Sequence, residues 1–363
     1  MKAKKYVLLL TSLFLFHATY STAKSNMIDN PFNLNTESTL SNNYNADINS
    51  FWQQYAHAST FQGIDNKTVH SIAITTGNDK AIVISQGRNE SVLKYKEIAY
   101  DLNLQGYDLF LIDHRGQGLS ERFGGDQHRG HVVNFQDYVD DLNQYVNSLA
   151  LDKNYAQRYL LSHSMGGAIS ALYLEQFNSP FQGAIFFSPM LSINLGSLPA
   201  FLAKIVTSSS AEVCSWFTDK ACYVPAGKGY STRQFENNQL THSKKRFYSG
   251  QHGFETVPET QLGDATMRWV SSSISATQQA IKKANKIDIP LLLIQAGADE
   301  VVTSEGQKDF FDNINNCKES QFLTIDDAKH EILIESDEFR IPALTHSLQF
   351  LTSIAQGRLI CTK

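Results

Sequence analysis

Short apolar runs alternate with longer segments of helical periodicity along most of the chain. Alternating and β-branched stretches, which are typical of strands, lie at 59–63, 69–75, 81–85, 109–113, 159–162, 183–187, 291–294 and 322–325. Apolar residues recur at helical spacing over 91–104, 135–149 and 338–354. Strands that alternate with helices predict an α/β fold with a mostly parallel sheet and helices on both of its faces.

Two intervals break this rhythm. Residues 191–286 are rich in Ser, Thr, Gln, Phe and Tyr, so we expect them to form a lid domain inserted between core segments 51–190 and 287–363. The apolar segment 198–206 predicts an amphipathic helix that either faces a ligand cleft or packs only within the insertion. Residues 24–50 are rich in Asn, Ser and Thr, which favours an exposed leader.

The N-terminus has the three regions of a secretory signal. Three lysines precede an apolar run at 6–16, and the small residues Ser21, Thr22 and Ala23 follow. The run is too short to span a bilayer, so we expect 1–23 to be a cleaved signal peptide and the protein to be periplasmic or secreted. Removing the three lysines takes the formal net charge from −5 to −8, which argues against a nucleic-acid partner.

The cysteine count is consistent with export. An even number of cysteines in an exported chain favours disulfides, and Cys214, Cys222, Cys317 and Cys361 allow three pairings. We expect Cys214–Cys222 to close a short loop in the lid and Cys317–Cys361 to tie the last strand region to the C-terminus.

The run 160–168 (LLSHSMGGA) resembles a strand that delivers a serine to a sharp turn at the start of a helix. Such a nucleophile elbow holds Ser164 at positive φ and needs small residues two positions to either side, here Ser162 and Gly166. The usual pattern is Gly-x-Ser-x-Gly, and Ser162 departs from it. The alternative is a small-residue turn without catalysis.

A nucleophilic serine needs a base and an acid that orients the base. In doubly wound hydrolases the three residues follow the order Ser, Asp, His. Asp299 lies just beyond the strand at 291–294, with Glu300 as its rival, and His330 lies just beyond the strand at 322–325. The sequence therefore predicts the triad Ser164, Asp299 and His330. His346 is a weaker candidate because it lies inside the predicted last helix.

A tetrahedral intermediate needs two backbone N–H groups for its oxyanion. We expect one from Met165, at the start of the helix, and the other from Arg88, beside Gly87 in the loop after the strand at 81–85. In one interpretation the Arg88 guanidinium meets a phosphate, and in the other it is solvated. No cofactor is expected, and His128 and His131 lack the partners of a metal site.

Several motifs together resemble the monoacylglycerol-lipase-like branch of the α/β-hydrolases, and within it the bacterial lysophospholipases. They are 86–91 (QGRNES), 113–120 (DHRGQGLS), 128–131 (HRGH), 138–142 (YVDDL), 162–167 (SHSMGG), 240–243 (LTHS), Asp299 and 329–331 (KHE). The resemblance implies the α/β-hydrolase fold, the triad above, a lid and single-acyl lipid substrates. Gln86 departs from it, because lipases of the wider branch often have histidine at that position.

Three polar clusters carry further expectations. Arg115 can pair with Asp113 to brace the glycine-rich loop, and Asp140 and Asp141 lie on a helix as a solvated or bracing pair. The basic trio at 244–246 (KKR) is a candidate contact for an anionic head group or a membrane surface, although such trios are often only solvated. No other substrate contact is assigned.

We therefore expect a serine hydrolase that cleaves the carboxylic ester of lysophospholipids through an acyl-enzyme, with peripheral membrane contact. The alternative within the same class is a monoacylglycerol lipase or general carboxylesterase. The alternative from another class is a catalytically silent lipid-binding protein, since a fold does not determine a function.

Overall fold

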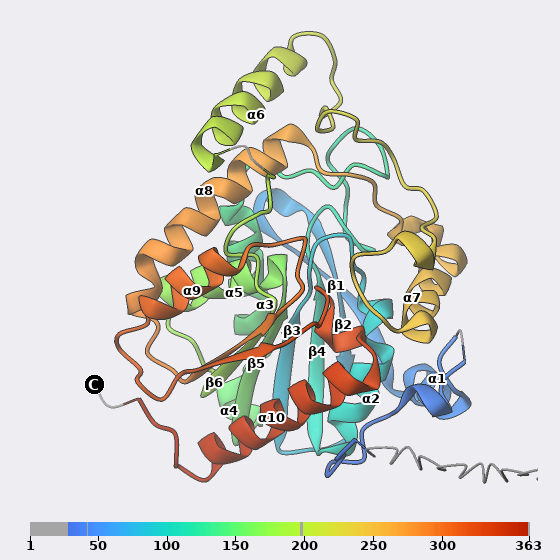
Figure 1. The fold of residues 1–363 in the computed structure, drawn as a ribbon, viewed down its shortest axis with the longest axis vertical. Helices are drawn as coiled ribbons and strands as arrows, with labels where there is room; N and C mark the ends of the chain where they lie inside the picture. Colours follow the sequence, from blue (N-terminus) through green and yellow to red (C-terminus); the bar gives the residue numbers. More distant parts are fainter. Residues whose placement is uncertain (1–27, 42, 197–198, 362–363) are drawn as a thin grey trace, which may run out of the picture.

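An eight-stranded sheet runs through the middle of the computed structural model, which describes residues 28–41, 43–196 and 199–361 (Figure 1). The predicted signal peptide, 1–23, lies outside the described residues. The strand order is β1-β2-β4-β3-β5-β6-β7-β8. The strands are β1 (Ala56–Gln62), β2 (Thr68–Ile74), β3 (Lys80–Ser85), β4 (Tyr107–Asp113), β5 (Gln157–His163), β6 (Gly183–Phe187), β7 (Leu291–Ala296) and β8 (Gln321–Ile325).

Strands β3 to β8 run parallel, whereas β2 pairs antiparallel with both β1 and β4. All eight stretches that the sequence pattern marked as strands are strands. The predicted α/β fold with a mostly parallel sheet is therefore confirmed. The carboxyl ends of the parallel strands meet at one edge of the sheet, where α/β active sites form.

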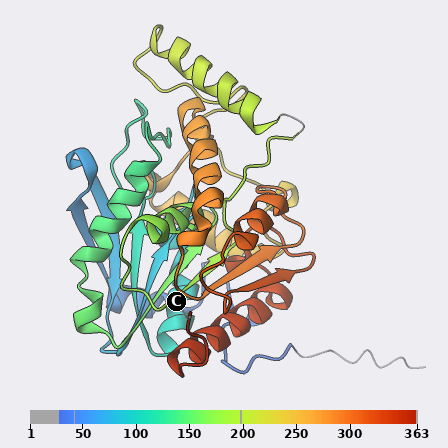
Figure 2. The same ribbon diagram turned by 90° about the vertical axis from the view of Figure 1, so that its left-hand side faces the viewer.

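Helices cover both faces of the sheet (Figures 1 and 2). Successive side chains of a strand point to opposite faces, so Ala81 and Val83 of β3 join one core cluster and Ile82 and Ile84 join the other. The first face carries α3 (Gln136–Ser148), α4 (Leu151–Asn154), α5 (Met165–Gln176), α8 (Met267–Lys283) and α9 (Ser304–Asp312). The second face carries α1 (Ala46–Tyr55), α2 (Lys96–Leu104) and α10 (Asp337–Ala355).

Residues 28–50 differ from the expected exposed leader. Leu34, Leu40, Tyr44 and Ile48 are buried, and Asn35 donates two hydrogen bonds to the Asp101 carboxylate of α2. A few widely spaced apolar residues are enough to pack this segment onto the core, although its average composition is polar. The described part of the expected leader therefore belongs to the fold.

The long connection between β6 and β7 contains α6 (Ala200–Ser215), α7 (Lys244–Thr256) and α8, with short 3-10 helices at Phe235–Asn237 and Pro258–Thr260. Helix α8 packs against α5, and its Ile274 and Ala280 belong to the main core cluster. The expected insertion, 191–286, therefore ends in a helix that the core shares. Composition gives no sign of this contact, because one buried helix hardly changes the average of a polar interval.

Helix α6 stands at the top of the molecule, beyond α8 (Figures 1 and 2). Ala203 is buried against its surroundings, but Phe201, Ile205 and Val206 are more than half exposed. One face of the helix packs on α8, as expected for packing within the insertion. Its apolar residues line no part of the cavity described below, so the helix does not face a ligand cleft.

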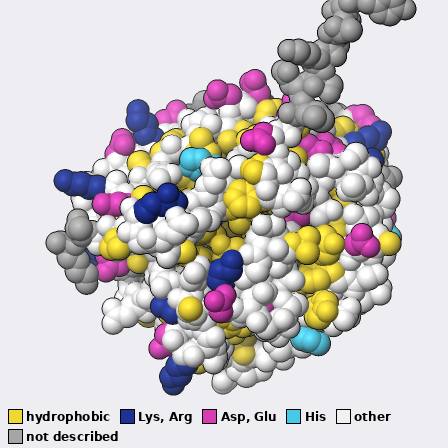
Figure 3. Space-filling model, turned by 90° about the horizontal axis from the view of Figure 1, so that it is seen from below, with side chains coloured by type: hydrophobic (Ala, Val, Ile, Leu, Met, Phe, Trp, Pro, Cys, Tyr) yellow, Lys and Arg dark blue, Asp and Glu magenta, His cyan; other side chains and the backbone are white. Residues whose placement is uncertain are grey.

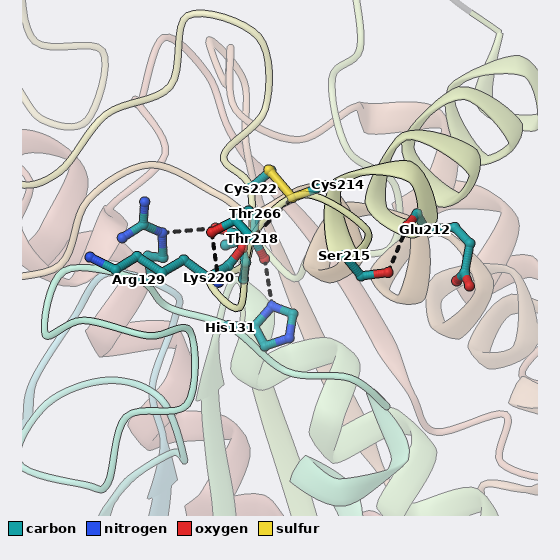
Figure 4. Close-up of a disulfide and its surroundings, with 10 residues drawn as sticks. Arg129, His131, Glu212, Cys214, Ser215, Thr218, Lys220, Cys222 and Thr266 are labelled. Carbon is teal, nitrogen blue, oxygen red and sulfur yellow. Dashed lines mark hydrogen bonds between the residues drawn. A yellow bond between two sulfur atoms is a disulfide. The ribbon is translucent and has the colours of Figure 1, made fainter.

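The two expected disulfides are present. Cys214, in the last turn of α6, forms a disulfide with Cys222 (Figure 4). The neighbouring Ala221 donates to the Gly124 carbonyl and accepts from Arg129 Nε, so the disulfide ties α6 to the loop after β4. Cys317–Cys361 joins residues 44 positions apart, next to the C-terminus. The pairing predicted from the sequence is therefore confirmed.

Seen from the end opposite α6, the surface shows acidic and basic side chains scattered among apolar ones, with no large area of one charge (Figure 3). Among the described residues, no helix is long and apolar enough to cross a bilayer.

Candidate active site

Ser164 lies at the sharp turn between β5 and α5, as the sequence predicts. Its φ of 49° and ψ of −118° are unusual for a residue with a side chain, which is the strain expected of a nucleophile elbow. A side chain at Gly166 would overlap the carbonyl oxygen of Ser85, so only glycine allows α5 to approach β3 this closely.

The serine that replaces the first glycine of the motif fits its site. Ser162 is fully buried, and its hydroxyl donates a 2.7 Å hydrogen bond to the Ser170 hydroxyl of α5. A buried hydroxyl is costly only when it lacks a partner. The departure from the usual pattern is therefore compensated by a second serine two turns along the helix.

The three predicted triad residues form one hydrogen-bonded chain. His330 Nε2 lies 2.9 Å from Ser164 Oγ, and His330 Nδ1 lies 2.7 Å from Asp299 Oδ2. Their side chains come from three separate loops at the carboxyl edge of the sheet, after β5, β7 and β8. This arrangement lets the imidazole take the serine proton while the carboxylate fixes its tautomer.

Asp299, and not its neighbour Glu300, faces the histidine. The second Asp299 oxygen accepts from the amides of Val301 and Val302 at 2.8 and 3.1 Å. Burial alone would raise the pKa of Asp299, but the hydrogen bond and charge of His330, with the two amides, lower it. The carboxylate is thus held in its charged form beside the base.

The two residues predicted to supply oxyanion donors lie on either side of Ser164. Met165 is the first residue of α5, where backbone N–H groups have no helical partner. A Cβ built on Gly87 would lie 3.1 Å from Ser164 Cβ, so the segment that carries the Arg88 amide lies directly against the serine. The Arg88 guanidinium donates to the carbonyls of Gly263 and Asp264 and is not simply solvated.

Two residues that the sequence analysis gave no role hold this oxyanion loop. Glu90 Oε2 accepts a 2.6 Å hydrogen bond from the Gly87 amide, and Gln117 Nε2 donates to the Gly87 carbonyl at 2.7 Å. Both lie in motifs that carry the family resemblance, 86–91 and 113–120, which was the available signal. We infer that they are positioning residues, because they touch the loop and not Ser164.

A buried charge network surrounds Glu90. Its carboxylate accepts from Lys94 and Tyr95 and lies 3.3 Å from His163 Nδ1. Burial alone would raise the pKa of Glu90, but Lys94 and His163 hold it well below its ordinary value. The His163 ring centroid lies 5.0 Å from that of His330, so this network lies next to the histidine that the sequence predicts as the base.

The expected Asp113–Arg115 pair does not form. Arg115 instead donates to the Asp141 carboxylate of α3, with Nε–Oδ2 and Nη2–Oδ1 distances of 2.5 and 2.8 Å. Asp113 accepts from Gln86 and lies 2.8 Å from His70 Nδ1. Asp140 and Asp141 were expected to be either solvated or bracing, and Asp141 braces the glycine-rich loop through Arg115.

The basic trio at 244–246 is not an open cationic surface. Arg246 is fully buried and forms ion pairs with Glu97 and Asp337. Lys245 Nζ donates to the Glu37 carbonyl at 2.6 Å, and Lys244 lies outside the cavity, 3.8 Å from Glu236. The hypothesis that this trio meets a head group is wrong, because two of its three side chains hold the N-terminal segment and α10 to α7.

Ser164 and His330 line a cavity of about 850 Å³. Residues from the β6–β7 connection, between 228 and 254, also line this cavity, together with Trp269 of α8. Apolar positions include Met190, Phe247 and Ile334. The volume lies in the upper part of the range of about 300–1,000 Å³ that is usual for small-molecule sites.

The fold and the Ser–His–Asp chain define an α/β-hydrolase with a serine nucleophile. The family model "Serine aminopeptidase, S33" matches residues 76–337, more than half of the chain. The protein therefore belongs to this family of serine hydrolases.

Curated relatives agree with this membership. Lysophospholipase L2 of Escherichia coli K12 is 35% identical over 309 residues, which cover 84% of this chain and 89% of that protein. Probable lysophospholipase L2 of Haemophilus influenzae is 30% identical, covering 84% of this chain and 95% of its own. Monoglyceride lipase of Homo sapiens is 29% identical over 234 residues, covering 64% and 69%.

Solved structures show the same fold. A soluble variant of monoglyceride lipase from Saccharomyces cerevisiae, in complex with a substrate analog, superposes with a TM-score of 0.64 at 17% identity. The match covers 83% of this chain and 96% of that one. A carboxyl esterase from Bacillus coagulans, described as highly thermostable, gives a TM-score of 0.64 at 14% identity, covering 83% and 99%.

Proposed function

We propose that the protein hydrolyses the carboxylic ester of lysophospholipids, releasing a fatty acid and a glycerophospho-alcohol. The observation that carries the proposal is the chain Ser164–His330–Asp299, with hydrogen bonds of 2.9 and 2.7 Å. Its first two residues line a cavity large enough for a single-acyl lipid. Two curated relatives that cover most of this chain bear the name lysophospholipase L2.

The reaction proceeds in two halves. Ser164 Oγ attacks the ester carbonyl carbon while His330 Nε2 takes the hydroxyl proton, and the amides of Met165 and Arg88 stabilise the resulting oxyanion. The intermediate collapses when His330 returns the proton to the glycerol oxygen, which leaves as the glycerophospho-alcohol. Water then attacks the acyl-enzyme in the same way and releases the fatty acid.

A matched substrate panel tests this function. We expect the purified protein to cleave 1-oleoyl lysophosphatidylethanolamine with a higher kcat/KM than 1-monooleoylglycerol or p-nitrophenyl butyrate. The fatty acid released below the critical micelle concentration is the measured product. An aminoacyl p-nitroanilide belongs in the panel because the family is named for a peptidase.

The monoglyceride lipase relative supports the second candidate. Rapid cleavage of monooleoylglycerol with no cleavage of the lysophospholipid would replace the first proposal with the second. Cleavage of the anilide alone would contradict both.

Export is part of the proposal. The signal predicted at 1–23 and the disulfides Cys214–Cys222 and Cys317–Cys361 support a periplasmic or secreted protein, because disulfides persist in oxidising compartments. Lysophospholipids of a membrane surface are accessible from such a compartment.

The β6–β7 connection is proposed to act as the lid, with α6 as a peripheral membrane contact. At the end of α6 and just beyond it, Val213, Trp216 and Phe217 are 46%, 72% and 82% exposed. Contiguous exposed apolar side chains are typical of membrane or protein contacts, and aromatic residues favour the bilayer interface. Helix α6 thus offers apolar side chains to a membrane that holds the substrate.

Exchanging Trp216 and Phe217 for serine is expected to lower co-sedimentation with phosphatidylglycerol-containing vesicles at least about tenfold, because each aromatic ring loses its transfer into the interface. Leu104→Ser is the matched control, since Leu104 is 59% exposed on α2, on another part of the surface. Equal binding by the double variant and the wild type would contradict the contact.

A further inference from the structure

The cavity above Ser164 is cationic although the chain as a whole is acidic. The formal net charge of the chain is −5. Four of the charged side chains that line the cavity are basic, Arg88, Lys94, Lys228 and Arg233, and Glu331 is the single carboxylate among the lining residues that the structure describes. Positive charge is therefore concentrated where the substrate binds.

One of these four cations is already neutralised. Lys94 Nζ lies 2.8 Å from Glu90 Oε1 and 2.5 Å from Glu331 Oε1, so its charge serves the network behind the base. The other three, Arg88, Lys228 and Arg233, form no ion pair with any residue in 28–41, 43–196 or 199–361.

Arg88 is held in place without a carboxylate. Its Nη2 donates to the carbonyl oxygens of Gly263 and Asp264, and its Cζ lies 4.8 Å from the ring centroid of Trp269. Its Nε is buried and has no hydrogen-bond partner. Burial lowers the pKa of Arg88 to about 10, which still leaves the side chain charged at neutral pH. A buried cation that forms no ion pair with a described residue favours an anion in the cavity.

Arg233 stands on the same wall, in the loop before the 3-10 helix Phe235–Asn237. With the Asn89 side-chain amide in its favoured orientation, the amide oxygen accepts from Arg233 Nη2 at 3.0 Å, and the amide nitrogen donates to Leu262. Asn89 follows Arg88 in the chain, so this contact brings the two arginines together. The exposed guanidinium of Arg233 keeps further N–H donors for a ligand.

We propose that Arg233 and Lys228, backed by Arg88, bind the phosphodiester of the lysophospholipid head group while Ser164 attacks the ester. This inference rests on the proposed function and names the part of the cavity that distinguishes a lysophospholipid from a monoacylglycerol. Arginine suits the role because its planar fork donates two parallel hydrogen bonds to phosphate oxygens. Lys228, which also lines the cavity, adds a point charge.

The test compares 1-oleoyl lysophosphatidylglycerol with 1-monooleoylglycerol, which share the acyl chain and ester and differ by the phosphoglycerol group. The measured quantity is the ratio of their kcat/KM values below the critical micelle concentration. For Arg233→Gln we expect this ratio to fall about tenfold or more, since a charge-assisted hydrogen bond to phosphate is lost. Arg233→Lys should restore part of the ratio, because it returns the charge without the fork.

Lys244→Gln is the matched control. It removes the same charge from neighbouring α7, outside the cavity, where Lys244 is largely exposed. We expect the substrate ratio of this variant to equal that of the wild type. Thermal unfolding midpoints of all variants should agree, which shows that the ratio and not the fold has changed.

Two results separate failure of the inference from failure of the function. A wild type that cleaves monooleoylglycerol but not the lysophospholipid contradicts the proposed function. A wild type that cleaves both, with the same ratio in Arg233→Gln, overturns the phosphodiester site alone. Competition by inorganic phosphate as strong as that by glycerophosphoglycerol assigns the site to free phosphate and also overturns the head-group proposal.

Discussion

Replacing Ser164 or His330 by alanine is expected to lower kcat/KM for a lysophospholipid by about four to six orders of magnitude, because each change removes the nucleophile or its base. The expected result follows from the 2.9 Å contact between Ser164 Oγ and His330 Nε2. Initial rates of fatty-acid release measure the loss, and circular dichroism checks the fold.

His346→Ala is the matched control for the base. His346 lies on α10, and its Nε2 is 3.0 Å from Gln321 Oε1, so its loss should leave the rate nearly unchanged. A fluorophosphonate probe should label the wild type and not Ser164→Ala. If the wild type resisted the probe and Ser164→Ala kept the full rate of the wild type, the serine mechanism would be wrong. A wild type with neither labelling nor hydrolysis would instead fit a silent lipid-binding protein.

Exchange of Asp299 for asparagine is expected to lower kcat by about 10³- to 10⁴-fold, since an amide beside His330 Nδ1 favours the wrong tautomer of the imidazole. Glu300→Gln provides a matched control from the adjacent position. Its side chain is exposed and is not part of the chain Ser164–His330–Asp299. A larger effect for Glu300→Gln than for Asp299→Asn would reverse the assignment of the acid.

The lowered pKa of Asp299 gives this variant a second signature. A carboxyl whose folded-state pKa is depressed stabilises the protein above its unfolded pKa, and this contribution is lost as the pH falls through the folded value. The difference in unfolding free energy between wild type and Asp299→Asn should therefore be largest near neutral pH and shrink below about pH 4. Urea unfolding at several pH values measures it.

Local patterns were sufficient to predict the sheet and the triad. Strands of a parallel sheet are buried on both faces, so runs such as the one in β7 stand out from the chain around them. The elbow can be recognised in the sequence because the close contact of α5 with β3 requires glycine at position 166. Asp299 and His330 can be recognised because each follows a predicted strand directly. Each signal lies within a few residues of the feature it predicts.

Local patterns did not predict the ion pairs between residues that lie far apart in the sequence. Arg115 and Asp141 are 26 positions apart, and Arg246 and Glu97 are 149 apart, so no local spacing connects them. The same charge in the sequence is compatible with a solvated surface, a buried brace or a ligand contact. In the folded protein, Arg115 and Arg246 form buried ion pairs, whereas Arg233 lines the cavity.

Periodicity in the sequence was enough to predict the α/β fold, and the strand ends were enough to predict that Ser164, Asp299 and His330 meet at the carboxyl edge of the sheet. The even cysteine count favoured disulfides but left three pairings open. The fold was needed to see that the described part of 28–50 packs on the core, that α6 exposes apolar side chains, and that Glu90 and Gln117 hold the loop that carries the Arg88 amide. The physical reason is that burial and charge pairing are properties of neighbours in space, and those neighbours come from distant parts of the chain.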